Sequence, residues 1–129
     1  MSMTLAVKNL PKQNGGYQHF RGPVFIAGWL WLDADGAKLF DWESGGSVPL
    51  CDTEACVAMR ACLPPPGEYL GGALLQVWVR ESSSGPELYD AHWVDFFDPG
   101  GEFGVVRWGM RVFVRPVPPQ YDSSRPPPL

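Results

Sequence analysis

Residues 24–42 read VFIAGWLWLDADGAKLFDW, and this stretch decides the fold. β-Branched and aromatic residues fill most of the first nine positions, which predicts a strand over 24–32. The DADG segment at 33–36 supplies acidic turn formers and a glycine that tolerates positive φ. Strand-like residues then resume over 37–42, so the stretch predicts a β-hairpin.

The first strand of this hairpin is apolar on both faces. Successive side chains of a strand point to opposite sides, and a small β-domain has only one interior. If the aliphatic side fills the core, the aromatic side must lie outside. The aliphatic side consists of Val24, Ile26, Leu30 and Leu32; the aromatic side consists of Phe25, Trp29 and Trp31, joined by Phe40 or Trp42 from the next strand.

Three interpretations of the aromatic side remain open. Another segment of the chain could cover it, a partner protein could bind it, or nucleic-acid bases could stack on it. The carboxylates around the aromatic residues disfavour base stacking, because they repel phosphates. We therefore predict a protein interface made of Phe25, Trp29, Trp31, Phe40 and Trp42, with acids at Asp33, Asp35, Asp41 and Glu43.

The rest of the chain predicts several short strands and one helix. Good helix formers occupy 54–62, with Asp52 or Thr53 as the N-cap and three prolines at 64–66 that forbid continuation. Apolar and polar residues alternate over 106–115, which favours a strand with a break at Phe113. The remaining strands are expected at 47–50, within 69–80 around its strand-like end at 75–80, and at 88–97.

This order of elements predicts a mainly β fold. A meander of three strands, one helix and two further strands is the order of a small five-stranded OB-like Greek-key barrel, with its short helix between strands three and four. The length of 129 residues fits one such domain. We expect a flexible N-terminal arm over 1–20, the barrel over 21–115 and a disordered proline-rich tail over 116–129.

The segment from Val24 to Pro99 resembles single-barrel subunits of the type of the replication protein A middle subunit and RecQ-mediated genome instability protein 2. The resemblance rests on the apolar strand that closes on Gly28, the turn at 35–46 (DGAKLFDWESGG), the PGEY segment at 66–69 and the strand that ends at Asp98-Pro99. Two features depart from it: Gly71-Gly72 falls early, and the C-terminal segment alternates like a strand where those subunits have a helix. The resemblance implies a scaffold in a genome-maintenance complex that binds a protein partner, with or without single-stranded DNA.

Charge is divided unevenly along the chain. Residues 1–32 contain three bases and no acid, residues 33–102 contain thirteen acids and three bases, and residues 103–129 contain four arginines and one acid. An acidic chain is a poor general nucleic-acid binder. The alternative function, single-stranded nucleic-acid binding, would use the exposed aromatics with Lys38 and a stripe formed by Arg107, Arg111 and Arg115. That stripe could instead pair with the chain's own acids.

The sequence favours no enzyme, cofactor or metal site. His19 and His92 are far apart, and His92 lies among strand aromatics, which favours a structural role. The DADG segment lacks the later ligands of a calcium loop, so a turn is expected there. Three cysteines at 51, 56 and 62 fit reduced thiols better than a disulfide framework. With no apolar run of membrane-spanning length, we expect a cytoplasmic or nuclear protein.

Overall fold

The computed structural model of the chain describes residues 4–10, 22–98 and 107–121. The helical elements are α1 (Thr53–Cys62) and the 3-10 turns η1 (Val7–Asn9) and η3 (Pro119–Tyr121). The strands are β1 (Thr4–Ala6), β2 (Val24–Asp33), β3 (Gly36–Phe40), β4 (Ser47–Leu50), β5 (Tyr69–Ser82), β6 (Gly85–Asp98) and β7 (Arg107–Phe113).

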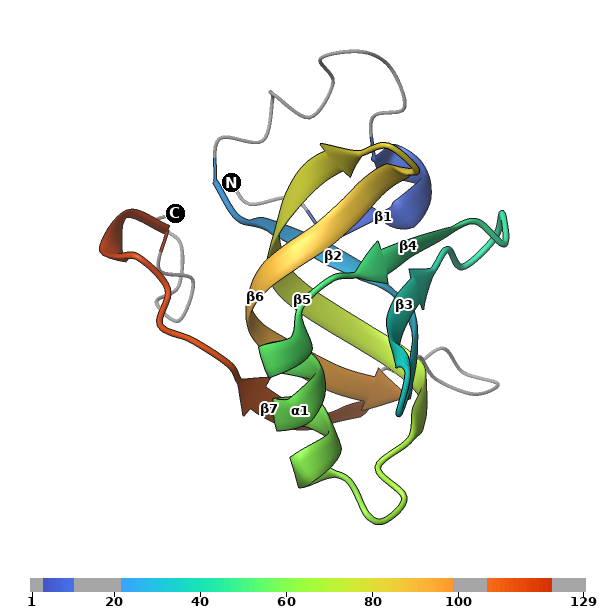
Figure 1. Ribbon diagram of the computed structural model, residues 1–129, viewed down its shortest axis with the longest axis vertical. Helices are drawn as coiled ribbons and strands as arrows, with labels where there is room; N and C mark the ends of the chain where they lie inside the picture. The colour runs from blue at the N-terminus through green and yellow to red at the C-terminus, as the bar shows by residue number, and fades with distance from the viewer. Residues whose placement is uncertain (1–3, 11–21, 99–106, 122–129) are drawn as a thin grey trace.

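Five of these strands close into a barrel (Figure 1). Around the barrel the order is β2-β3-β4-β6-β5, and β5 pairs again with β2. The contact of β4 with β6, between Leu50 and Leu88, is parallel, and the other four pairings are antiparallel. Helix α1 follows the third barrel strand. The OB-like barrel expected from the sequence is therefore confirmed.

The hairpin of β2 and β3 forms as its sequence predicts. Asp33 accepts a hydrogen bond from the Asp35 N–H at 2.8 Å, and Gly36 takes a positive φ of 143°. Ile26, Leu30 and Leu32 point into the barrel and are buried, as expected for the aliphatic side of the strand.

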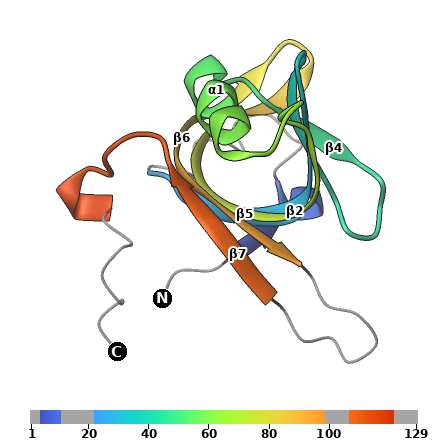
Figure 2. The same ribbon diagram turned by 90° about the horizontal axis from the view of Figure 1, so that it is seen from below.

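Helix α1 covers one end of the barrel (Figure 2). Its side chains Ala55 and Met59 are buried in the core. Its N-cap is Asp52, which accepts a hydrogen bond from the Ala55 N–H. The same carboxylate accepts hydrogen bonds from the Ala91 N–H on β6 and from the guanidinium of Arg115. Asp52 therefore joins the helix, the barrel and the segment after β7.

Two strands lie outside the closed barrel. β1 pairs in parallel with the first half of β2, and β7 pairs with the second half of β6 and crosses outside the ring of strands (Figure 2). The alternation over 106–115 thus forms a strand as expected, although Val106 lies outside the described residues. Because β3 pairs with β2 only from Trp29 onward, the earlier part of β2 has an edge available to β1.

Both ends of the chain differ from the expectation of a flexible arm and an unpacked tail. Residues 4–10 form β1 and η1, and they bury the apolar side chains of Val7 and Leu10 against the barrel. Residues 116–121 follow β7 and include η3, and the Pro116 carbonyl contacts the ring of His92. The remaining parts of the expected arm and tail, 1–3, 11–20 and 122–129, lie outside the described residues.

Within the described part of the chain, no helix is long and apolar enough to cross a membrane.

Candidate protein-interaction surface

Aromatic side chains line up across neighbouring strands on the outside of the barrel. Phe40 on β3 is in register with Trp29 on β2, which is in register with Gly72 on β5. Gly72 is opposite Phe97 on β6, and Phe97 is opposite Trp108 on β7. Directly opposite residues share a face of the sheet, so these side chains form one row across five strands.

Trp42 adds to this row from the turn after β3. Its ring centroid lies 5.0 Å from that of Trp29 and 6.0 Å from that of Phe97, distances at which aromatic pairs attract. Trp42 therefore contacts both Trp29 and Phe97, the two aromatic residues that lie on either side of Gly72 in the row. A Cβ atom at Gly72 would lie 2.8 Å from the Phe97 ring, so glycine allows that ring to lie close to the strand.

Trp31 and Leu70 extend the surface by a second row. They face each other across β2 and β5, and the Trp31 ring lies 6.1 Å from that of Phe40. We call the whole set the aromatic face: Trp29, Trp31, Phe40, Trp42, Leu70, Phe97 and Trp108.

Much of the aromatic face is exposed. The exposed fractions are 51% for Trp31, 37% for Trp42, 59% for Trp108 and 70% for Leu70. With roughly 150–250 Å² per aromatic side chain, the three tryptophans alone leave about 200–400 Å² exposed. The largest apolar patch on a typical monomer is about 300–600 Å², and it is often a functional surface. The chain therefore does not enclose these tryptophans, as an outward-facing aromatic patch requires.

A β-bulge places Trp108 on this face. Arg111 is opposite Asp95 and Trp108 is opposite Phe97, so Gly109 and Met110 together face the single residue between the two β6 positions. One extra residue reverses the side to which all earlier side chains point. Regular alternation over 106–115 predicts Trp108 on the same side of the strand as Val112, and the bulge places it on the opposite side.

Asp41 fixes the turn that carries Trp42. Its carboxylate accepts hydrogen bonds from the backbone N–H groups of Ser44, Lys8 and Glu43, at 2.9, 2.9 and 3.0 Å. These hydrogen bonds hold the pKa of Asp41 well below its ordinary value, and the bond from the Ser44 N–H contributes most. The carboxylate thus stabilises the turn and also links it to η1.

Phe25 lies apart from the rest of the expected interface. It is half-buried, and its ring lies 5.9 Å from that of Trp93 on β6, which is buried. The other four expected residues, Trp29, Trp31, Phe40 and Trp42, lie together in the aromatic face. Leu70, Phe97 and Trp108 also belong to the aromatic face, although the sequence did not predict them there. Alternation over 88–97 could have indicated Phe97. The isolated glycine at 109 is a general signal for a β-bulge, but it does not specify the register shift that turns Trp108 outward.

The three arginines of the expected stripe have different environments. Arg111 makes two hydrogen bonds to Asp95, and Arg115 binds Asp52 and Glu54 near the helix. These carboxylates raise the pKa of both arginines. Arg107 is exposed at the start of β7. The three guanidinium groups therefore do not form a single available stripe. Lys38, the other expected cation, is exposed on β3 beside the aromatic face.

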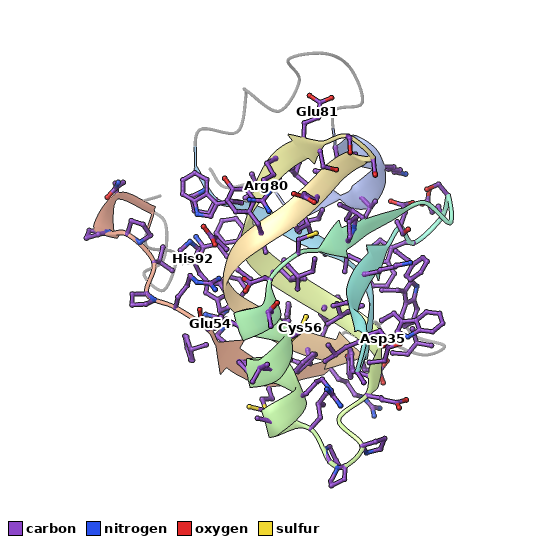
Figure 3. The ribbon with its side chains drawn as sticks, in the orientation of Figure 1. Asp35, Glu54, Cys56, Arg80, Glu81 and His92 are labelled. Atoms are coloured by element: carbon purple, nitrogen blue, oxygen red, sulfur yellow. The ribbon has the colours of Figure 1, made fainter. Side chains whose placement is uncertain are left out.

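His92 and the cysteines have structural surroundings. His92 lies on β6 (Figure 3) and is buried. Its Nε2 accepts from the Trp78 indole N–H at 3.1 Å, and its Nδ1 lies 3.0 Å from the Pro116 carbonyl. This pattern identifies the neutral Nδ1–H tautomer. Cys51 and Cys62 are exposed, Cys56 is half-buried, and burial raises the pKa of Cys56. Among the described residues, no three His, Cys, Asp or Glu side chains gather as metal ligands.

Two hollows adjoin the aromatic face, each with a volume of about 490 Å³. One lies between Trp29 and Trp108, over Gly71 and Gly72. The other lies beside Trp31 and Phe40, and Asp33, Asp35 and Lys38 are among its lining residues.

The fold and this surface define an OB-like barrel with an exposed aromatic face. Comparisons with models of protein families, with curated proteins and with solved structures gave no match.

Proposed function

We propose that this chain is a non-catalytic protein-interaction module, a subunit of a larger assembly, and that its aromatic face binds a partner protein. The observation that supports this most directly is the exposure of Trp31, Trp42 and Trp108 on one continuous surface. Exposed tryptophans are typical anchors of protein interfaces. The resemblance to single-barrel subunits suggests that the assembly serves genome maintenance.

The charges around the aromatic face favour a protein over single-stranded nucleic acid. Phosphate binding needs several available cations. Arg111 and Arg115 are engaged by carboxylates of the chain, so Lys38 and Arg107 remain. The carboxylate of Asp33 lies beside the Trp31 indole, where it would repel a phosphate backbone.

Partner capture with matched variants tests the proposal. The full chain would be used as bait, and captured proteins would be purified and rebound to it. We expect Trp31→Ser and Trp108→Ser each to weaken rebinding at least tenfold, a loss of about 1.4 kcal/mol. Glu81→Ser is the control, because Glu81 is exposed and lies at the opposite end of the barrel from Asp35 (Figure 3).

Two results would contradict the proposal. One is a partner that rebinds equally well to the tryptophan variants and to the control. The other is salt-sensitive binding of a labelled single-stranded oligonucleotide that both tryptophan substitutions weaken, which would support the nucleic-acid alternative instead.

A further inference from the structure

The barrel holds one of its arginines between an aromatic ring and a carboxylate. The Arg111 guanidinium lies 4.0 Å from the Trp93 ring centroid, and it donates two hydrogen bonds to Asp95, at 2.5 and 2.7 Å. Trp93 and Asp95 are two residues apart on β6, so they share a face. Arg111 is directly opposite Asp95 on β7.

A second arginine is held in the same way. The Arg80 guanidinium lies 4.4 Å from the Tyr89 ring centroid and 2.5 Å from the Glu87 carboxylate. Glu87 and Tyr89 are again two residues apart on β6, and Arg80 is directly opposite Glu87, on β5. The chain therefore builds the same arginine site twice: an aromatic residue and an acid on one face of a strand, with the arginine opposite the acid.

A third pair of this kind occurs on β2, at Trp31 and Asp33. The Trp31 indole N–H donates to Asp33 at 3.2 Å, and Asp33 also accepts from the Asp35 N–H, so the carboxylate is fixed beside the ring. The residue opposite Asp33 is Gly36 on β3. Nothing lies within 4 Å of the position that a Cβ atom would take at Gly36.

This third pair is open where the other two are filled. Trp93 is only 4% exposed beneath Arg111, whereas half of Trp31 is exposed. No arginine contact to Trp31 or Asp33 is found among the described residues. The space is the hollow beside Phe40, which Asp33 and Asp35 make acidic and which Lys38 borders.

We propose that Trp31 and Asp33 form a receptor site for an arginine side chain of the partner protein. This inference rests on the proposed function and names the group that the partner presents. A planar guanidinium can stack flat on an indole and bind both oxygens of a carboxylate through its rigid donor fork, whereas a lysine ammonium is a compact charge without this fork. The excess of carboxylates in the hollow complements the positive charge. Lys38, which is in register with Trp31, repels the incoming arginine and lowers its affinity.

The probe is N-acetyl-arginine amide, added to the full chain, with N-acetyl-citrulline amide as the uncharged control of the same shape. Binding is followed by NMR through the indole N–H resonance of Trp31, assigned with Trp31→Phe. We expect a saturable shift with the arginine probe that weakens as salt rises, and no saturable shift with the citrulline probe.

Variants distinguish a specific site from general attraction. Asp33→Asn should weaken probe binding about tenfold, because a charge-assisted pair is lost. Lys38→Gln should strengthen it. Glu81→Gln is the matched control, because Glu81 lies at the opposite end of the barrel from Asp35 (Figure 3), and it should change nothing. Equal binding of both probes, or unchanged binding in Asp33→Asn, would overturn the inference.

The failure of this inference differs from the failure of the proposed function. If Trp108→Ser abolishes rebinding of the partner and Asp33→Asn has no effect, the aromatic face is the interface and the arginine site is refuted. If the arginine probe binds as expected but the partner ignores every substitution in the aromatic face, the proposed function is refuted. The site for an arginine side chain then stands, but the partner is refuted as the source of that arginine.

Discussion

Replacement of Asp52 by alanine should destabilise the fold strongly, because one carboxylate serves three segments. It caps α1 through the Ala55 N–H, at 3.1 Å, and accepts from the Ala91 N–H of β6, at 2.8 Å. It also receives the guanidinium of Arg115, whose side chain is 21% exposed. The side chain of Asp52 itself is 5% exposed, so water can replace few of the hydrogen bonds that the substitution removes.

The cost can be estimated from these contacts. Loss of an N-cap costs about 1 kcal/mol, and a buried N–H without an acceptor costs about 1–3 kcal/mol. Arg115 keeps its contacts with Glu54 and the Ala91 carbonyl, so its charge is not left alone. Since neighbouring effects do not simply add, we expect a total of about 3–4 kcal/mol. For a domain near this size, that lowers Tm by roughly 10–20 °C.

Urea unfolding of the wild type, Asp52→Ala, Asp52→Asn, Arg115→Met and the double variant measures this. Asparagine keeps a capping oxygen, so Asp52→Asn should lose about half as much as Asp52→Ala. The double variant should lose less than the sum of the single losses. A loss below about 1 kcal/mol for Asp52→Ala, or strictly additive losses, would refute the idea that Asp52 joins these segments.

The same carboxylate predicts a pH dependence. Burial is the largest single influence and raises the pKa of Asp52, but the hydrogen bonds from Arg115, Ala55 and Ala91 together outweigh it and hold the pKa below its ordinary value. A carboxyl whose pKa is lower in the folded state stabilises the fold above its unfolded pKa, and this stabilisation is lost as pH falls through the folded pKa. The stability gap between wild type and Asp52→Asn should therefore narrow below about pH 4, as measured by urea unfolding across pH.

Other positions give further tests. Gly28→Ala places a Cβ atom 2.5 Å from the Phe40 carbonyl oxygen, so it should cost about 1–3 kcal/mol in urea unfolding, and a neutral effect would contradict the close approach. His92→Phe removes both ring hydrogen bonds and should cost about 2 kcal/mol while moving the Trp78 indole resonance, whereas an unmoved resonance would disprove that contact. The pKa of Asp41 is lowered in the fold, so its carboxylate stabilises the fold above its ordinary pKa, and this stabilisation disappears at lower pH. Asp41→Asn should therefore reduce the loss of unfolding free energy at acidic pH. An unchanged dependence of the unfolding free energy on pH would argue against this role of Asp41.

Short-range patterns predicted the elements of this fold well. The hairpin of β2 and β3, the helix behind Asp52 and the strand β7 all depend on residues a few positions apart, and the structure has each of them. The boundaries were less accurate: β5 begins at Tyr69 as expected but continues to Ser82, and β6 begins at Gly85, before the expected position 88, because the two strands pair up to their connecting turn.

The candidate site was only partly predictable. The exposed Trp31 and Trp42 follow from the two apolar sides of the hairpin, since one barrel has one interior. Phe25, from the same side of the strand, is half-buried because Trp93 of β6 packs against it. The sequence pattern could not show which distant strand would cover which part of that side.

The sequence by itself determined the alternation of apolar residues, the turns and the helix cap, because these arise from neighbours along the chain. Only the tertiary structure decided that the bulge at Gly109 turns Trp108 outward, and that Arg111 and Arg115 pair with acids 16 and 63 residues away. A period of two specifies two faces of a strand, but it specifies neither the partner strand nor its register. Those depend on contacts between segments that are distant in the sequence, and the aromatic face is assembled from such contacts.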